Sequence, residues 1–259
     1  MAEKANIQSL DRAFDILEQL CQVSGGMAIR DLTAATGLNK STVHRMLQTM
    51  IARGYVVQDE ISGRYHMTTK LYALGGQVVD NLDLVETARY PMNALSREVE
   101  ETVHLVVPEG TDIVYVYKME AGQDSVRMVS RIGMHRPLYC TASGKAILAC
   151  WSAGEVERIW AESRIISYTP HTITDRVKLQ TELEEIHRNG VAFDREENEL
   201  GVRCIGAAIR DYSGQVCGAL SISVPQQHER YHRMEELKEP LLRAQMQIAS
   251  RMGYKEVKK

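Results

Sequence analysis

Residues 38–54 read Leu-Asn-Lys-Ser-Thr-Val-His-Arg-Met-Leu-Gln-Thr-Met-Ile-Ala-Arg-Gly, and this stretch decides the fold of the first part of the chain. Apolar residues recur along it at helical spacing, which predicts a helix with one buried face: Val43, Met46, Leu47, Met50 and Ile51. Asn39 is suited to cap the start of this helix. The stretch also carries Lys40, Arg45 and Arg53 but no carboxylate. Its polar face can therefore lie against phosphate groups without repulsion.

The residues on either side of this helix complete a small domain. A helix is predicted from residue 7 to 23, before Gly25-Gly26, with an apolar stripe formed by Ile7, Leu10, Phe14, Leu17 and Cys21. Residues 29–36 predict a second short helix, which Gly37 ends. Residues 55–57 and 64–67 predict a β-hairpin around Ser62-Gly63. Helix, helix, tight turn, helix and hairpin is the order of a winged helix-turn-helix, and we set its bounds at residues 1–69.

This domain predicts binding to double-stranded DNA, because a helix of this size fits the major groove. We expect four side chains of the polar face to lie in that groove: Ser41, Thr42, His44 and Arg45. Lys40 and Arg53 are expected beside phosphates, and Arg64 on the hairpin beside the backbone or in the minor groove. The alternative for each is an ordinary solvated side chain. For the domain, the alternative is a helical unit without a DNA partner, which the acid-free face and the tight turn at residues 36–39 argue against.

The rest of the chain predicts a linker helix and an α+β domain. Residues 70–83 form the expected linker, with Gly75-Gly76 in its middle suited to close packing against a second copy. Residues 84–101 predict a helix that Pro91 bends or interrupts. Strands are predicted at 103–107, 113–118, 126–131, 202–210 and 216–224, and helices at 143–151, 153–163, 176–189 and 230–252. This mixture favours a sensor domain around a central antiparallel sheet over residues 84–259.

Composition excludes several classes of protein. The 259 residues are 44% hydrophobic and 25% charged, as in ordinary globular proteins. The apolar runs are far shorter than the roughly 20 residues that cross a membrane, so no membrane partner is expected. The five cysteines are odd in number and form no Cys-x-x-Cys motif, which argues against a disulfide scaffold and a zinc ribbon. With no secretory signal at the N-terminus, the expected compartment is the cytoplasm.

Two motifs identify a resemblance. One is the run Lys-Ser-Thr-Val-His-Arg at 40–45; the other is Gly190-x3-Asp194-x2-Glu197-x6-Cys204-Ile205-Gly206-x2-Ile209. Together they resemble the IclR family of bacterial transcription regulators over nearly the whole chain. The second motif departs from the family at Arg210-Asp211, where the family usually has an aromatic residue or His before the Asp. The resemblance implies a winged helix, a linker helix and a GAF-like effector domain. It also implies a homodimer or a dimer of dimers on a palindromic operator, with no cofactor and no enzymatic activity.

Further segments resemble the subgroup of this family that senses 2-keto-3-deoxygluconate during the breakdown of pectin and uronates. They are Leu82-Asp83-Leu84, Glu101-Thr102-Val103-His104-Leu105, Ile113-Val114-Tyr115-Val116, Ser130-Arg131-Ile132-Gly133, Arg136-Pro137-Leu138-Tyr139 and Arg251-Met252-Gly253-Tyr254. The expected function is a repressor of sugar-acid catabolism that such a 2-keto acid releases from DNA. The alternative within the family is a regulator of another small carboxylate (glyoxylate, pyruvate or an aromatic acid), including an activator.

The resemblance also implies where the effector binds. Ala142 and Ser143 match the positions whose backbone amides hold the effector carboxylate, although some members have Gly-Ala there. They follow residues 137–140, which look like a strand, and the Ser143 hydroxyl is either a further donor or a helix cap. The other polar positions of the family pocket match Asp194, Cys204, Ser221 and Ser223. Ser221 and Ser223 share one face of their strand, which is either a buried pocket or the solvated side.

Several other polar residues have open roles. Glu197 and Arg203 are as suited to a structural ion pair as to anything else. His104 and Arg131 are candidate pocket residues, with a packed strand histidine and a surface arginine as the favoured readings. A rival function is an enzyme with Cys204 as nucleophile beside Asp194 and a histidine, but no local motif supplies the activating base. A metal site at Cys140, His104 or Cys204 lacks ligand spacing, and loss of the DNA role is opposed by the intact face at 40–45.

Overall fold

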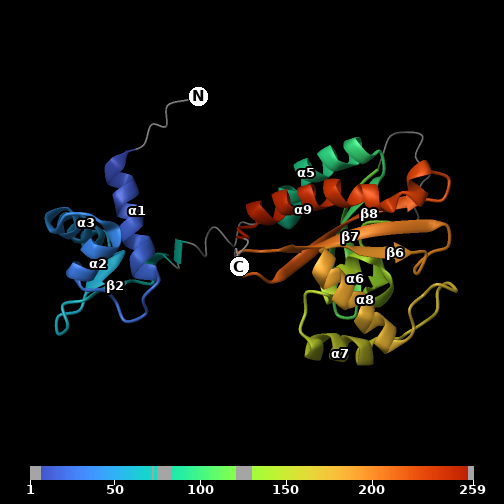
Figure 1. Cartoon of the computed structure of the whole chain (residues 1–259), viewed down its shortest axis with the longest axis horizontal. Coiled ribbons are helices and arrows are strands. Elements are labelled where there is room, and N and C mark those ends of the chain that lie inside the picture. Colours follow the sequence, from blue (N-terminus) through green and yellow to red (C-terminus); the bar gives the residue numbers. More distant parts are fainter. Residues whose placement is uncertain (1–6, 72, 75–82, 121–129, 256–259) are drawn as a thin grey trace. The chain divides into compact units, whose positions relative to one another are not determined.

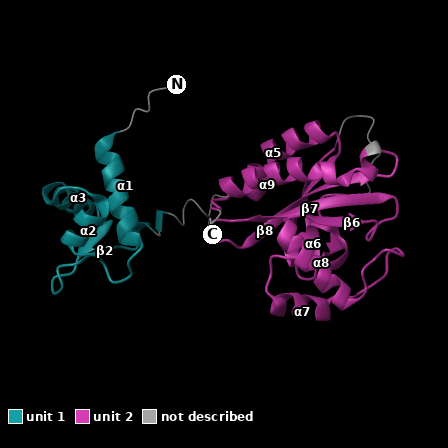
Figure 2. Ribbon diagram, in the orientation of Figure 1, with its two compact units in different colours: residues 1–82 teal, residues 83–259 magenta. Residues whose placement is uncertain are grey.

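The computed structural model describes residues 7–71, 73–74, 83–120 and 130–255 (Figure 1). It divides into two compact units, residues 1–82 and 83–259 (Figure 2). Most of the expected linker helix lies outside the described residues, since only 70, 71, 73 and 74 of it are described as helical. Each unit is therefore described by itself.

The first unit is a winged helix-turn-helix. Its helices are α1 (Gln8–Cys21), α2 (Ile29–Thr36) and α3 (Lys40–Ala52), and its antiparallel hairpin pairs β1 (Val56–Gln58) with β2 (Tyr65–Met67). Gly37 ends α2 with φ of 66°, a left-handed conformation that a side chain would disfavour. Asn39 stands at the N-cap of α3, but its side chain makes no capping hydrogen bond. The core is built by residues from all these elements: Ile16, Leu20, Leu32, Val43, Leu47, Met50, Val56 and Tyr65.

Helix α1 exposes much of its apolar stripe. Ile16 and Leu20 are its buried residues, whereas Ile7, Leu10 and Phe14 are 65%, 50% and 52% exposed. The helix was therefore predicted correctly, but most of the stripe that predicted it does not face the core of its own unit.

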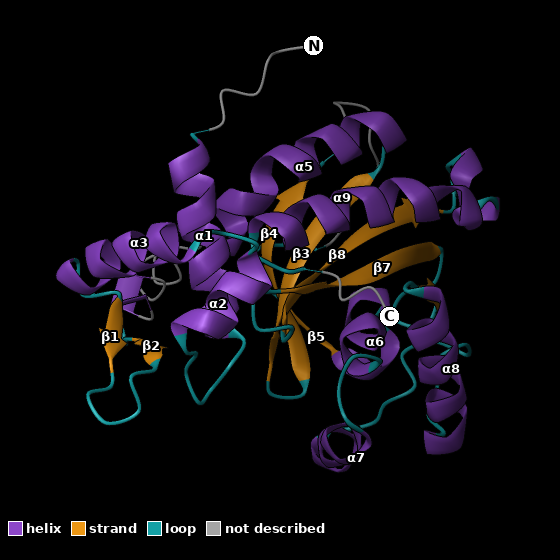
Figure 3. Cartoon of the chain, turned by 60° about the vertical axis from the view of Figure 1, so that its left-hand side comes forward, coloured by secondary structure: helices purple, strands orange, loops and turns teal. Residues whose placement is uncertain are grey.

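Within its described residues, the second unit is built on a six-stranded antiparallel sheet of order β5-β4-β3-β8-β7-β6. The strands are β3 (Thr102–Glu109), β4 (Asp112–Met119), β5 (His135–Pro137), β6 (Ala192–Arg195), β7 (Val202–Arg210) and β8 (Val216–Pro225). Helices α5 (Leu84–Val99) and α9 (Lys238–Arg251) cover one face, and α6 (Ala142–Leu148) and α8 (Arg176–Asn189) cover the other (Figures 1 and 3). Helix α7 (Ala153–Glu162) packs outside them. This is the α+β, GAF-like arrangement expected from the sequence.

Several predicted elements differ from the structure. Residues 126–129 of one expected strand lie outside the described residues, and Ser130 and Arg131 are not in a strand. Strands β5 and β6 were missed, and residues 138–140 form a 3₁₀ turn rather than a strand. The expected last helix begins at Lys238 instead of residue 230, after two 3₁₀ turns (Glu229–His232 and Met234–Leu237). Helix α5 continues through Pro91 without interruption.

Candidate functional site

Helix α3 presents the face that the sequence predicts for DNA. Burial of Val43, Leu47 and Met50 against the core turns the opposite side outward. The exposed residues on that side are Lys40, Ser41, His44, Arg45, Gln48 and Thr49, and Thr42 is half-buried. The five residues of this helix that are expected to contact DNA therefore lie on one accessible surface: Lys40, Ser41, Thr42, His44 and Arg45.

The other two expected DNA contacts are exposed but differently held. Arg53 follows the last turn of α3, and its carbonyl oxygen accepts a hydrogen bond from Lys70 Nζ at 2.7 Å. Arg64 lies before β2, and its guanidinium Nη1 donates to the carbonyl oxygen of Gly26 at 2.8 Å. This bond ties Arg64 to its own unit. The tip of the hairpin carries Asp59 and Glu60 beside Ile61, which is 98% exposed.

In the second unit, the polar residues expected to hold an effector form one row across three strands. Asp194 of β6 stands opposite Cys204 of β7, and Cys204 stands opposite Ser223 of β8. Residues directly opposite each other in antiparallel strands share a face, and Ser221 lies on the same face as Ser223. Asp194, Ser221 and Ser223 are no more than 5% exposed, and Cys204 is half-buried. Of the two readings for the serines, the buried face is the observed one.

The start of helix α6 covers this row. Gly206 lies on β7, two residues after Cys204, and packs directly against the start of α6. A Cβ added to Gly206 would lie 2.7 Å from Ser143 N and 2.8 Å from Ala142 C. Ala142 and Ser143 are both buried. Thr141 caps the helix, because its Oγ1 accepts a hydrogen bond from Gly144 N at 3.1 Å. Ser143 is thus inside the first turn and not the cap, which leaves the donor role as its open alternative.

Behind α6 lies a buried ion-pair cluster that was not predicted from the sequence. Lys145 is 0% exposed, and its Nζ contacts Glu197 Oε1 at 2.5 Å and Glu182 Oε1 at 3.0 Å. The suggested Glu197–Arg203 pair is wrong, since Arg203 contacts Glu196 at 3.7 Å and lies over the Tyr231 ring at 4.4 Å. The one available signal was a lysine within a short run of Ala, Gly, Ile and Leu at 142–148.

This cluster and burial together control the charge of Asp194. Its Oδ1 accepts a hydrogen bond from Glu197 N at 2.6 Å. Burial, and then the charge of Glu197, raise the pKa of Asp194 to about 7, although Lys145 lowers it. Asp194 is therefore a carboxyl group that is largely protonated below neutral pH.

His104 on β3 belongs to the same face. It stands opposite Ser221, and its Nδ1 lies 3.4 Å from Ser223 Oγ, while its Nε2 lies 2.8 Å from Ser130 Oγ. Burial lowers the pKa of His104 to about 3, so the ring is neutral at physiological pH. The packed strand histidine that the sequence favours thus also borders the candidate effector residues. Arg131 is an exposed arginine.

The structure gives no support to the rival enzyme. The thiol of Cys204 lies 3.1 Å from Ser223 Oγ, and burial raises its pKa, so the unreactive thiol form is favoured. Among the described residues, no three His, Cys, Asp or Glu side chains are placed to hold a metal ion. Within the same residues, no helix has both the length and the apolar character to span a membrane.

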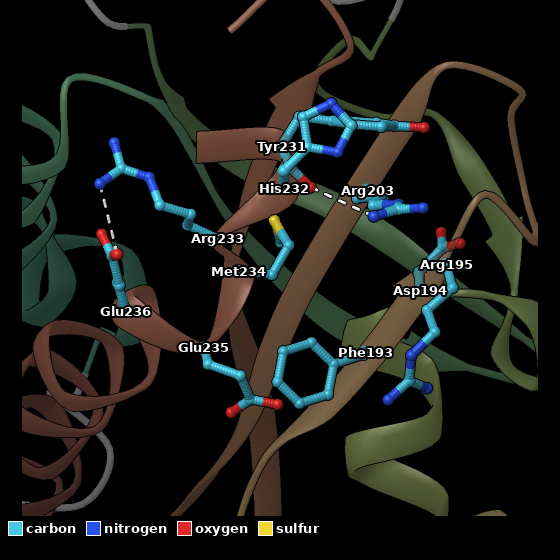
Figure 4. A pocket seen from close by; sticks show the side chains of 10 residues that line it. All are labelled: Phe193, Asp194, Arg195, Arg203, Tyr231, His232, Arg233, Met234, Glu235 and Glu236. Atoms are coloured by element: carbon cyan, nitrogen blue, oxygen red, sulfur yellow. Dashed lines mark hydrogen bonds and ion pairs between the residues drawn. The ribbon is translucent and has the colours of Figure 1, made fainter. Parts of the chain in front are cut away.

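A cavity lies on the opposite face of β6 and β7. It has a volume of about 340 Å³ and is bordered by Phe193, Arg203, Tyr231 and Met234 (Figure 4). Its arginines already have partners: Arg203 Nη1 donates to the Tyr231 carbonyl oxygen at 3.3 Å, and Arg233 pairs with Glu236. Asp194 is the one expected effector residue that borders it, so the row under α6 remains the stronger candidate site.

Comparisons with known proteins agree with both units. A family model described as the IclR helix-turn-helix domain matches residues 9–60, and one described as the bacterial transcriptional regulator IclR C-terminal matches residues 76–250. The transcriptional regulator KdgR of Escherichia coli is 37% identical over 249 residues, covering 96% of this chain and 94% of KdgR. The DNA-binding transcriptional repressor YiaJ of Escherichia coli is 34% identical over 252 residues, covering 96% of this chain and 89% of YiaJ. The crystal structure of the Agobacterium tumefaciens repressor BlcR superposes on this chain with a TM-score of 0.79 at 25% sequence identity. The match covers 97% of this chain and 99% of the BlcR chain.

Proposed function

The chain belongs to the IclR family of bacterial transcriptional regulators, and from this we propose that it represses genes of sugar-acid catabolism until a 2-keto acid such as 2-keto-3-deoxygluconate releases it from a palindromic operator. The protein acts in the cytoplasm as a homodimer or a dimer of dimers. The observation that carries the effector part is the buried polar row of Asp194, Cys204 and Ser223 beneath the first turn of α6.

The DNA contacts follow from the exposed face of α3. Arg45 projects from the middle of the helix and is suited to a bidentate bond to guanine, which is worth about 1–3 kcal/mol of discrimination. Ser41, Thr42 and His44 reach base edges or phosphates from the first turns. Lys40 and Arg53 at the ends of the helix contact phosphates and fix its position without reading sequence. Arg64 approaches the backbone, or the minor groove, from the hairpin.

The exposed stripe on α1 supports the proposed homodimer. Ile7 at the N-cap of α1, and Leu10 and Phe14 within the helix, are each at least half exposed, and an exposed apolar patch commonly marks an interface. A palindromic operator presents two half-sites about one helical turn or a multiple apart, which a two-fold dimer can occupy together.

The effector contacts follow from the chemistry of the row. Backbone N–H groups in the first turn of a helix have no partner within the helix, so those of Ala142 and Ser143 are suited to a carboxylate. The hydroxyls of Ser221 and Ser223, the Cys204 thiol and the Asp194 carboxyl line the sheet beneath them and are suited to keto and hydroxyl oxygens. The choice of 2-keto-3-deoxygluconate within this class is supported by the resemblance to the subgroup that senses it and by the 37% identity to KdgR.

Release from DNA is a shift between two arrangements of the dimer. The free protein holds its two winged helices at the spacing of the operator, and the effector favours a different arrangement, transmitted through the linker at 70–83. A ligand shifts such an equilibrium only by its difference in affinity for the two states.

A thermal-shift panel tests the effector class. A ligand that binds only the folded state raises the unfolding temperature with its occupancy, so 2-keto-3-deoxygluconate should stabilise the protein more than pyruvate, glyoxylate or an aromatic acid. Ser223→Ala should reduce this shift, and Ser62→Ala on the exposed hairpin should not. If only one of the other acids stabilised the protein, that acid would be the effector and 2-keto-3-deoxygluconate would not.

A gel-shift assay with genomic fragments tests the regulatory part. The protein should retain specific fragments, and 2-keto-3-deoxygluconate should release them. Retention that the ligand strengthens would indicate an activator, and no specific retention at all would contradict the DNA-binding role.

A further inference from the structure

We propose that Asp194 binds the effector as a neutral carboxylic acid, so that it donates a hydrogen bond to an anionic ligand, and that effector binding takes up a proton. This inference rests on the proposed effector site beneath α6. It makes Asp194 a specificity-determining residue, because a protonated carboxyl favours ligands that present acceptor oxygens.

The position of Asp194 disfavours a charge. The residue is 3% exposed on the covered face of β6, and its Oδ1 is held by the amide of Glu197 at 2.6 Å. Among the described residues, no lysine, arginine or histidine side chain forms an ion pair with it. A buried carboxylate without a paired cation is costly, and such a group usually takes up a proton instead.

The neighbouring charges already balance without Asp194. Lys145 lies between Glu197 and Glu182, and Arg195 Nη1 lies 3.6 Å from Glu182 Oε1. These are two cations and two carboxylates, so an ionised Asp194 would leave the cluster with one negative charge in excess. The proton on Asp194 removes that excess.

The cysteine, tyrosine and histidine groups that share the electrostatic field of Asp194 are neutral. Besides Lys145, the cations that act on these groups are Arg136, on Cys140 and Tyr115, and Lys118, on His104, and neither is among the charges that act most strongly on Asp194. Cys204 on β7, Cys140 before α6 and Tyr115 on β4 each feel its charge, and burial raises the pKa of all three, so they are neutral at physiological pH. Burial lowers the pKa of His104 on β3 to about 3, so this ring is neutral too. Glu199, in the connection after β6, is exposed and adds only a negative charge.

The ligand proposed for this face adds a further negative charge. Its carboxylate would lie at Ala142 and Ser143, above Gly206, which is two residues along β7 from the partner of Asp194. An ionised Asp194 would repel that carboxylate across a desolvated site, whereas the acid form donates to it or to the adjacent keto oxygen. Binding of the anion therefore raises the proton affinity of Asp194, and any deprotonated fraction takes up a proton from solvent.

Calorimetry of 2-keto-3-deoxygluconate binding, in buffers that differ in ionisation enthalpy, measures this proton directly. At pH 8 we expect uptake approaching one proton per site, and we expect the affinity to fall nearly tenfold between pH 7.5 and 8.5. Asp194→Asn keeps a donor without titrating, so its affinity should not change over that range. Asp211→Asn, in an exposed turn, should behave as the wild type. Ligand binding without proton uptake and with pH-independent affinity would overturn the inference and leave the effector assignment in place.

An NMR titration of the ligand-free protein tests the same claim without a ligand. With ¹³C-labelled aspartate, the carboxyl signal that disappears in Asp194→Asn should titrate near neutral pH. Titration of that signal near the ordinary aspartate value of about 4 would overturn the inference. A near-neutral titration without binding of 2-keto-3-deoxygluconate would support the ionisation state and contradict the proposed effector instead.

Discussion

Replacing Lys145 by methionine should destabilise the second unit strongly. Lys145 is fully buried between Glu197 and Glu182, at 2.5 and 3.0 Å. Methionine fills a similar volume but leaves Glu197 without its cation and Glu182 with only Arg195, at 3.6 Å. Removing one partner of a buried ion pair costs about 3–5 kcal/mol. With a urea dependence of about 2–3 kcal/mol per M, the unfolding midpoint should fall by about 1–2.5 M.

The tryptophans make this measurement specific to the second unit. The chain has two, Trp151 and Trp160, and both pack against the core of the second unit. Urea unfolding followed by tryptophan fluorescence therefore reports that unit. Lys178→Met removes an exposed lysine from α8 and is the matched control, with an expected change below about 0.5 kcal/mol.

Two further measurements separate charge from packing. Adding Glu197→Gln to Lys145→Met should recover part of the lost stability, because one uncompensated carboxylate is removed. The loss in Lys145→Met should also shrink from pH 8 to pH 5, because burial already raises the pKa of Glu197 and this carboxyl can take up a proton. A Lys145→Met midpoint equal to that of the control, or a double variant less stable than the single one, would refute the electrostatic reasoning.

Four other predictions follow from the two units. Gly206→Ala places a Cβ 2.7 Å from the backbone of α6 and should abolish the ligand-induced thermal shift; an unchanged shift would contradict the close approach. Arg45→Ala should cost about 1–3 kcal/mol and relax preference at one operator position in a binding-site selection, whereas Lys40→Ala should weaken all sequences alike and lower the salt slope by about one. Phe14→Glu should shift the protein toward monomer in sedimentation; unchanged mass would argue against the α1 interface. The pKa of Asp194 is raised in the folded state, so the unfolding free energy of the wild type should fall relative to that of Asp194→Asn as pH rises from about 4 to 7. The total fall should be at most about 4 kcal/mol, with no further change above pH 7. A difference in unfolding free energy that does not vary with pH in urea unfolding would contradict this.

The winged helix could be predicted from sequence because its signals are local. The apolar period of α3, Gly37 and the hairpin turn at Ser62-Gly63 each act within a few residues. The apolar period of α1 predicts the helix but not whether its apolar stripe is buried, because an exposed stripe and a core stripe have the same spacing.

The elements of the second unit that were missed or misplaced are those whose apolar residues show too little periodicity to identify them. β5 and β6 have three and four residues, too few to show alternation. Before α9, the buried residues Tyr231, Met234 and Leu237 recur every three residues, a spacing shared by α and 3₁₀ helices. The helix was therefore predicted to begin too early.

The candidate site depends on contacts that sequence does not encode locally. Asp194, Cys204 and Ser223 could be named from the resemblance, but their alignment in one row depends on the register of three strands. Lys145 was missed because a lysine is nearly always exposed unless it is paired, and its partners lie 37 and 52 residues away in the chain.

The central claim is that an effector bound in the second unit weakens DNA binding by the first. Calorimetry of 2-keto-3-deoxygluconate binding, with and without a saturating duplex that the protein has selected from a random pool, tests this most directly. The duplex should weaken ligand binding by the same factor by which the ligand weakens duplex binding, because coupling between two sites is reciprocal. Equal ligand affinity in the presence and absence of the duplex would contradict the account.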